Sequence, residues 1–125
     1  MRILADTSIW INHLRSADTL FQGFLEEGIV LMHPCVHCEL ALGSLKNRSE
    51  ILSLLAKLPQ TQIATNDEVL QAIEAKKLWG LGIGSVDAQL LAATLLTEAC
   101  ILWTLDTRLR KACEKAGAKL FHHVA

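Results

Sequence analysis

The sequence lacks the features that would mark a membrane, secreted or disordered protein. Only 5% of its 125 residues are aromatic, tyrosine is absent, and there are two prolines. No apolar run approaches the roughly 20 residues that span a bilayer. The first residues do not form a basic region followed by a long apolar stretch and a cleavage site. We therefore expect a cytoplasmic protein without a membrane contact.

Neither sign of charge is in excess. Twelve Lys and Arg residues face 13 Asp and Glu residues, which gives a net charge of −1, so bulk attraction would not hold a nucleic acid. Hydrophobic residues make up 51% of the chain and charged ones 20%, which excludes intrinsic disorder. The length predicts one domain over residues 1–125. A mean hydropathy of +0.32 suggests that some apolar surface is covered in an oligomer.

Four cysteines leave two kinds of site to consider. Without a secretory signal, Cys35, Cys38, Cys100 and Cys113 are predicted to be reduced. Cys35 and Cys38 form a C-x-x-C motif that leads into a predicted helix, whose N-terminus would lower a thiol pKa as in a redox protein. The same pair could bind zinc with a histidine. A structural zinc site needs a second ligand pair, however, and His122-His123 is the only obvious source.

Short apolar runs alternate with helical patterns along the chain. Strands are predicted at 2–5, 29–32, 101–105 and 119–121, and helices at 8–14, around 21–25, at 34–42, 51–58, from 65 onward, at 86–97 and 107–116. Ser85 is the predicted N-cap of the helix over 86–97, which is apolar nearly all round and should be buried. The alternation predicts an α/β fold, with a short parallel sheet covered by helices on both sides.

Four acidic residues occupy the places where a ligand would bind. In an open α/β sheet, ligands bind beyond the carboxyl ends of the strands. Asp6 and Asp106 directly follow apolar runs, Glu39 lies in the helix after the second run, and Asp87 lies in the first turn of the buried helix. Helix capping is the alternative role for the three aspartates. Glu39 lies in a weakly polar stretch, so we expect a buried carboxylate that needs a cation or a hydrogen-bond donor.

Taken together, the four acids predict a metal site. Two carboxylates about 4 Å apart repel by roughly 4 kcal/mol at an effective dielectric of 20. Four of them would therefore take up protons or bind a divalent cation. Oxygen ligands favour Mg²⁺ or Mn²⁺, which can activate water and stabilise charge on a phosphodiester. The hydroxyls of Thr7, Ser8 and Thr104 lie at the same edge and are suited to supporting the ligands.

Specific stretches surround these acids. They are Leu4-Ala5-Asp6-Thr7-Ser8, Cys38-Glu39-Leu40-Ala41-Leu42-Gly43, Ser85-Val86-Asp87-Ala88-Gln89-Leu90-Leu91-Ala92 and Leu102-Trp103-Thr104-Leu105-Asp106. In this order they resemble the PIN-domain family, and within it the small VapC-type toxin ribonucleases of toxin–antitoxin pairs. The resemblance covers essentially the whole chain. The Cys- and His-rich segment before Glu39 departs from the family pattern and leaves room for thiol sensitivity.

The resemblance implies an α/β/α sandwich with Mg²⁺- or Mn²⁺-dependent endoribonuclease activity. Asp6, Glu39, Asp87 and Asp106 match the family's acidic metal-site positions, whereas Ser8 and Thr104 match hydroxyl positions beside them. We expect the first three acids to bind the ion most tightly, and Asp106 to orient water or help bind a second ion. The resemblance also implies a VapB-like antitoxin, which alone would contact DNA. The apolar excess fits both this contact and a homodimer.

Several basic residues are candidates for RNA contacts near the acidic edge: Arg15, Lys46, Arg48, Arg108 and Arg110. Without a large basic patch, we expect a structured RNA, similar to tRNA or rRNA, that is recognised by shape and a few loop bases. Trp79 precedes a glycine loop and could stack on a base or meet a protein partner. Two alternatives remain open: a PIN-like binding module with weak or no cleavage, and a thiol redox protein that uses Cys35 and Cys38.

Overall fold

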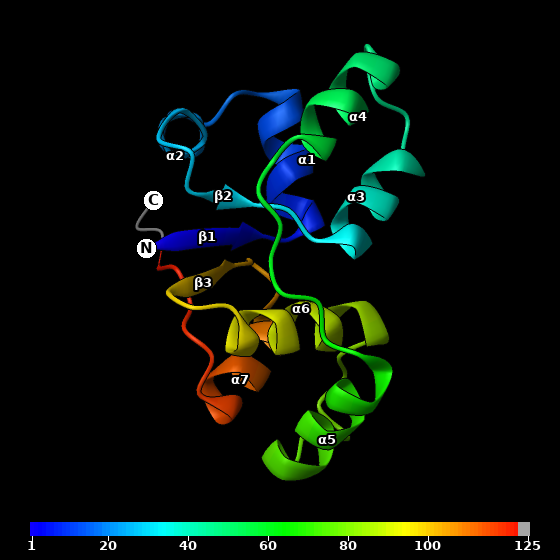
Figure 1. The fold of residues 1–125 in the computed structure, drawn as a ribbon, viewed down its shortest axis with the longest axis vertical. Helices are drawn as coiled ribbons and strands as arrows, with labels where there is room; N and C mark the ends of the chain where they lie inside the picture. The colour runs from blue at the N-terminus through cyan, green and yellow to red at the C-terminus, as the bar shows by residue number, and fades with distance from the viewer. Residues whose placement is uncertain (123–125) are drawn as a thin grey trace.

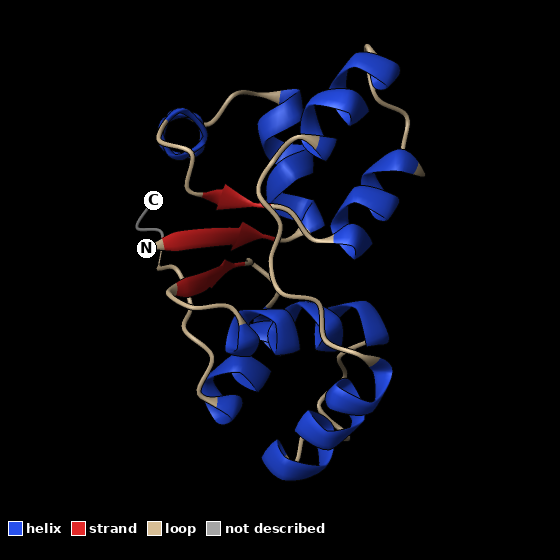
Figure 2. Cartoon of the chain, viewed as in Figure 1, coloured by secondary structure: helices blue, strands red, loops and turns tan. Residues whose placement is uncertain are grey.

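The fold is built on a three-stranded parallel sheet, seen in a computed structural model that describes residues 1–122 (Figure 2). The central strand β1 (Arg2–Ala5) lies between β2 (Val30–Leu31) and β3 (Cys100–Trp103). Leu4 pairs with Leu31 on one side and with Leu102 on the other. Residues 3–5 of β1 have no exposed surface, as expected for a parallel strand covered on both faces.

Seven helices within residues 1–122 surround this sheet. They are α1 (Thr7–Arg15), α2 (Thr19–Glu26), α3 (Pro34–Ala41), α4 (Arg48–Ala56), α5 (Asn66–Lys76), α6 (Ser85–Leu96) and α7 (Thr107–Ala116). Figure 1 shows α1, α3 and α4 at one end of the long axis and α5, α6 and α7 at the other, with the sheet between them. This arrangement confirms the predicted α/β class with helices on both sides of the sheet.

Most helix starts follow from the capping residues in the sequence. Asp6, Asp18 and Asp106 each accept a hydrogen bond from a backbone N–H of the helix that follows, and Thr65 and Glu68 form the predicted capping box. The prediction for α6 is wrong by one residue. Gly84 is its N-cap, and Ser85 is already helical, because the extended backbone of the glycine loop continues through Gly84.

The strand predicted at 119–121 is shorter than expected. Only Leu120 pairs with β3, through Leu102, although the N–H of Phe121 also donates to the Leu102 carbonyl at 2.8 Å. At the opposite edge, Met32 pairs with Gln60 in the same way. Each edge of the sheet is therefore extended by a single bridge, which leaves little unpaired backbone for another chain.

The core lies on both sides of the sheet and includes most of α6. Phe21 packs between Trp10 and Trp103, with ring centroids 4.7 and 5.6 Å away. Residues 90–94 of α6 are buried as predicted, but Leu95 and Leu96 at its end are 39% and 46% exposed. The longest of the described helices, α6, has 12 residues, and none within residues 1–122 could cross a lipid bilayer.

Candidate functional site

The parallel register brings Asp6 and Thr104 side by side at the carboxyl edge of the sheet. Ala5 pairs with Trp103, and the N–H of Asp6 donates to the Trp103 carbonyl at 3.0 Å. Asp6, which follows β1, and Thr104, which follows β3, therefore lie opposite each other at the end of the sheet. The Thr104 side chain is fully buried, and its hydroxyl donates a short hydrogen bond to Oδ2 of Asp6.

The second carboxylate oxygen of Asp6, Oδ1, is also held by hydrogen bonds. Oδ1 accepts hydrogen bonds from the Ser8 hydroxyl at 2.7 Å and from the Ile9 N–H at 3.1 Å. The side chain is only 8% exposed. Asp6 therefore caps α1 and also presents a fixed carboxylate at the sheet edge, so the capping role and the site role predicted from the sequence fall on one residue.

Asp106 is linked to Asp6 through Thr104. Its N–H donates to the Thr104 hydroxyl at 3.1 Å, the same hydroxyl that donates to Asp6. Its Oδ1 accepts hydrogen bonds from the N–H groups of Arg108 and Leu109 at 2.9 and 3.0 Å, which caps α7. Asp106 is exposed, so its second oxygen can face solvent or a ligand.

Glu39 approaches the same edge from α3. Its Oε1 accepts a hydrogen bond from the Thr7 hydroxyl at 2.6 Å, one residue after Asp6. The expectation that Glu39 is buried is wrong, because the side chain is exposed. Helix α3 instead buries Val36 and Leu40, and Glu39 lies at the flank of that face. The Thr7 hydroxyl is the hydrogen-bond donor that Glu39 was expected to need. The sequence had indicated Thr7 only as a nearby hydroxyl.

Asp87 lies where the charges of the other three acids reach it. It lies half-buried in the first turn of α6. Burial raises its pKa, and so do the negative charges of Asp106, Asp6 and Glu39, while a hydrogen bond with the Gly84 backbone opposes them. All four acids predicted from the sequence thus meet at one edge. Their mutual repulsion is a cost that a bound cation would remove.

The oxygen donors at this edge suit a hard divalent cation such as Mg²⁺ or Mn²⁺. In the part of the chain that the structure describes, no three His, Cys, Asp or Glu side chains already stand in an arrangement that would enclose an ion. The carboxylates of Asp6, Glu39 and Asp106 instead accept hydrogen bonds from hydroxyls and amides. Cation binding therefore requires side-chain adjustment, which is easiest for the exposed Glu39.

The basic residues predicted to contact RNA lie in different surroundings. Arg15 and Lys46 line a groove of about 650 Å³ between α1 and the start of α4. Arg15 is at the far end of α1 from Asp6, about 13 Å along the helix axis. Arg48 donates to the Ala41 carbonyl from Nε at 3.2 Å and Nη2 at 2.6 Å, so its guanidinium braces the end of α3.

Arg108 lies beside the acidic edge and makes an unexpected contact with the glycine loop. A Cβ placed on Gly82 would lie 3.0 Å from Cδ of Arg108 and 3.2 Å from its Nη1. Gly82 also has a φ of +78°, which a side chain would strain. Glycine at this position therefore lets the arginine lie across the loop that leads to Asp87. The alternating glycines in the sequence signalled a loop but not this contact.

The cysteine segment does not have the features of a redox or zinc site. All four cysteines are free, and Cys35 is half-buried. Burial raises the pKa of Cys35, as do the nearby Glu39 and Cys38, whereas a reactive thiol needs a lowered pKa. Within residues 1–122 no zinc-like ligand cluster forms. His123, the other half of the terminal histidine pair, lies outside the described residues.

His33 has a structural role that was not predicted. Its Nδ1 accepts a hydrogen bond from the Cys35 N–H at 3.0 Å, so this buried ring caps α3, the helix that carries Glu39. Burial lowers the pKa of His33, which favours the neutral ring that this bond requires. The signal in the sequence was its place directly before Pro34, a residue suited to a first helical turn.

Comparison with known proteins gives two findings. The PIN domain family model matches residues 3–115, a range that includes all four acids. The chain is also similar to Ribonuclease VapC32 of Mycobacterium tuberculosis, in strain CDC 1551 / Oshkosh and in strain ATCC 25618 / H37Rv. Each of these relatives is 46% identical over 123 residues, which is 98% of this chain and 99% of the relative.

Proposed function

Because the chain belongs to the PIN-domain family, we propose that it is a metal-dependent endoribonuclease that hydrolyses phosphodiester bonds in RNA. The main support is that Asp6, Glu39, Asp87 and Asp106 come from separate elements to one sheet edge, where three of them raise the pKa of the fourth. The name of its relatives, Ribonuclease VapC32, supports the same activity. The family match over 3–115 supports one domain over residues 1–125.

The cofactor proposed is Mg²⁺ or Mn²⁺, held by Asp6, Glu39 and Asp87. When bound, such an ion lowers the pKa of water and offsets negative charge on the phosphodiester. Asp106, whose second oxygen is free of the helix cap, orients the attacking water or contributes to a second ion. Ser8 and Thr104 fix the two oxygens of Asp6, and Thr7 directs Glu39 toward the edge. These three hydroxyls do not bind the ion themselves. They orient the carboxylates that would bind it.

Among the basic residues, Arg108 has the best support as an RNA contact. Its guanidinium lies across Gly82, two residues before the N-cap of α6, while its own backbone N–H donates to Asp106, the N-cap of α7. A backbone phosphate that reaches the acids would pass close to it. Arg15 and Lys46 are proposed as outer contacts, whereas Arg48 already binds a carbonyl. With a net charge of −1, a structured RNA such as tRNA or rRNA, recognised by shape, remains the proposed substrate.

Incubation of the purified protein with a total RNA pool tests the proposal. We expect discrete fragments with Mg²⁺ or Mn²⁺, none with EDTA, and none from Asp87→Asn that retains its circular dichroism spectrum. Sequencing of the fragment ends would identify the RNA. If folded protein that binds Mn²⁺ produces no fragments, the endoribonuclease proposal is wrong and a PIN-like binding module becomes the better reading.

We further propose that the protein is the toxin of a cytoplasmic toxin–antitoxin pair, with a VapB-like antitoxin as its partner. The groove lined by Arg15 and Lys46 also has an apolar wall of Ile11, Leu14 and Ile51. A partner segment with apolar and acidic side chains would complement it. An Ile51→Ala variant, which removes apolar contact without adding a charge beside Arg15 and Lys46, should cleave RNA like the parent but be inhibited less by the antitoxin. Inhibition that is equal for parent and variant would exclude this groove as the contact.

A homodimer is proposed from the exposed leucines Leu95 and Leu96 at the end of α6. Light scattering of the toxin alone and of its complex with the antitoxin gives the oligomeric state directly. DNA is proposed to be contacted only by the antitoxin. The toxin alone should therefore leave operator DNA unshifted in a gel, and a shift with the toxin alone would contradict this assignment.

A further inference from the structure

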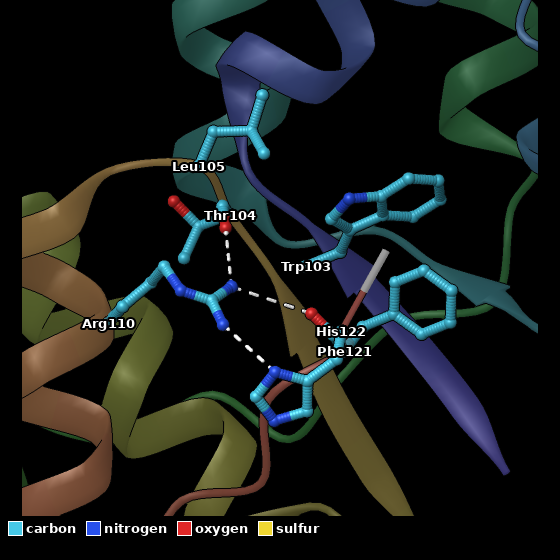
Figure 3. A pocket seen from close by; sticks show the side chains of 6 residues that line it. All are labelled: Trp103, Thr104, Leu105, Arg110, Phe121 and His122. Carbon is cyan, nitrogen blue, oxygen red and sulfur yellow. Dashed lines mark hydrogen bonds between the residues drawn. The ribbon is translucent and has the colours of Figure 1, made fainter. Parts of the chain in front are cut away.

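Arg110 joins the acidic edge to the segment that follows α7. The side chain is half-buried and starts four residues after Asp106, on the same face of α7. Its Nη1 donates to the Thr104 carbonyl at 3.1 Å and, more weakly, to the Phe121 carbonyl at 3.5 Å. Its Nη2 lies 3.0 Å from Nδ1 of His122. Figure 3 shows the guanidinium between these three partners.

Thr104 is the residue through which Arg110 reaches the acids. Its carbonyl accepts from Arg110, while its hydroxyl donates to Asp6 and accepts from the Asp106 N–H. One threonine thus connects the arginine to two of the four acids. A guanidinium suits this place because its planar fork can bind several acceptors in fixed directions, which a lysine ammonium on a flexible stem cannot.

Apolar packing alone does not hold this part of the chain. Thr104, Leu105 and Arg110 line a cavity of about 280 Å³ together with Trp103, Phe121 and His122 (Figure 3). Leu105, which lies between Thr104 and Asp106, is 59% exposed. The segment therefore borders open space on its solvent side, and the hydrogen bonds of Arg110 to the Thr104 and Phe121 carbonyls bridge that space.

We propose that Arg110 is a positioning residue for the acidic edge. By holding the Thr104 carbonyl against the segment at 121–122, it fixes the hydroxyl that orients the Asp6 carboxylate and the N–H of Asp106. Arg110 touches neither RNA nor an acid in this role. Its effect on cleavage rests on the proposed function, whereas its effect on the Thr104 contacts can be measured without RNA or metal.

Arg2 provides a matched control for testing this role. Its Nε donates to the Glu98 carbonyl at 3.1 Å, so it also braces a backbone carbonyl, but at the amino end of the sheet. The variant Arg110→Met removes the contacts with the Thr104 and Phe121 carbonyls, and Arg2→Met removes the contact with the Glu98 carbonyl. We expect hydrogen exchange of the Asp106 amide, measured by NMR, to become at least about 10-fold faster in Arg110→Met and to stay unchanged in Arg2→Met. Unchanged exchange in Arg110→Met would overturn the proposal.

Cation binding gives a second readout. Loss of a partner that orients a metal ligand typically weakens affinity or activity about 10- to 100-fold, so Arg110→Met should bind Mn²⁺ about 10-fold more weakly in calorimetry. Arg2→Met should bind it like the parent, even if both variants lose similar thermal stability. Equal weakening in the two variants would mean a general loss of structure and would overturn the specific role of Arg110.

The conservative variant Arg110→Lys separates geometry from charge. Lysine keeps the charge and can reach one acceptor, so Mn²⁺ affinity should lie between those of the parent and Arg110→Met. Full recovery would show that charge suffices and would overturn the positioning role.

RNA kinetics then distinguish positioning from substrate contact. Positioning predicts a lower kcat with KM for RNA unchanged within about twofold, whereas a raised KM with unchanged kcat would mean an RNA contact and overturn the proposal. If the parent neither cleaves RNA nor binds Mn²⁺, the proposed function fails. The Asp106 exchange rate still decides the role of Arg110 in that case.

Discussion

The acidic edge has two halves that the fold holds in different ways. In the strand half, Asp6 follows β1 directly, Asp106 lies three residues after the end of β3, and both share the buried Thr104 hydroxyl. In the helix half, Glu39 and Asp87 project from α3 and α6, and Glu39 is exposed with a single hydroxyl partner. The strand half is therefore oriented before any ligand arrives, while the helix half can still adjust.

This difference separates two tasks that a cation site combines. Fixed carboxylates set the position of the ion accurately, and movable carboxylates close around the ion after it binds. Repulsion between the negative charges acts on Asp87, whose pKa is raised by burial and by the three other acids. Substitutions in the strand half should therefore change both stability and function, whereas substitutions in the helix half should lower function without destabilising the fold.

The largest effect is expected for Asp6→Ala. The variant removes a proposed cation ligand, so cleavage should fall by more than the about 100-fold that loss of a supporting residue can cause. It also leaves the Ile9 N–H and the Thr104 hydroxyl without their acceptor, and should cost about 1–2 kcal/mol of unfolding free energy. Denaturant unfolding and RNA cleavage measure the two effects.

Asp18→Ala is the matched control for this variant. Asp18 caps α2 by accepting from the Phe21 N–H at 2.9 Å, away from the acidic edge. It should lose about 1 kcal/mol of stability and cleave RNA like the parent. If Asp18→Ala lost as much activity as Asp6→Ala, a capping defect would explain both results and the two halves would not differ.

Glu39→Gln should abolish most cleavage without a change in stability. The glutamine carbonyl can still accept from the Thr7 hydroxyl, and the side chain is exposed, so unfolding free energy should stay within about 0.5 kcal/mol. Loss of the charge should lower Mn²⁺ affinity more than about 10-fold in calorimetry. Glu74→Gln, an exposed change on α5, should leave both properties unaltered. Marked destabilisation by Glu39→Gln would contradict the assignment of Glu39 to the adjustable half.

Thr104→Val tests the link inside the strand half. It removes one hydroxyl that serves two acids, so cleavage should fall about 10- to 100-fold and stability by about 1–3 kcal/mol. Thr94→Val is the control, because Thr94 is also buried and donates to the Leu90 carbonyl at 2.8 Å within α6. It should lose stability only. Normal cleavage by Thr104→Val would show that Asp6 is oriented without this hydroxyl.

Much of the strand half could be predicted because its geometry is local to the strands. Asp6 directly follows the apolar strand β1. Asp106 lies shortly after the apolar strand β3, which ends at Trp103 and not at the predicted Leu105, and parallel pairing still places both acids at one edge. The same reasoning found the hydroxyl of Thr104. The pattern of apolar and acidic residues could not predict the contacts of Arg110. These contacts depend on the segment after α7, which pairs with β3 through Leu120.

The helix half was predicted less accurately, since the burial of a helical residue depends on what the helix packs against. The weakly polar stretch around Glu39 suggested a buried carboxylate, but α3 turns Val36 and Leu40 inward instead. The burial of Cys35 beside Glu39 and Cys38 likewise raised a thiol pKa that the helix N-terminus was expected to lower. Tertiary contacts decided both cases, and the sequence does not specify them residue by residue.

The smallest expected effect is a gain of stability in Asp87→Asn, the variant that also removes cleavage. The folded-state pKa of Asp87 is raised, so the folded protein holds this proton more strongly than the unfolded chain does, and stability falls as pH rises through the folded pKa. A neutral asparagine avoids that loss. The melting temperature should rise by roughly 2–4 °C at pH 7, which corresponds to about 1 kcal/mol or less.

Asp67→Asn separates this gain from the effect of removing a charge at a helix start. Asp67 lies exposed in the first turn of α5, where its charge favours the helix dipole, so its loss should cost about 0.3–1 kcal/mol. The two asparagine variants should therefore shift the melting temperature in opposite directions at pH 7. The gain in Asp87→Asn should also shrink as the pH is lowered through the raised pKa of Asp87, because the parent carboxyl then becomes protonated. A gain that is independent of pH, or a loss in both variants, would mean that repulsion among the four acids does not strain the fold.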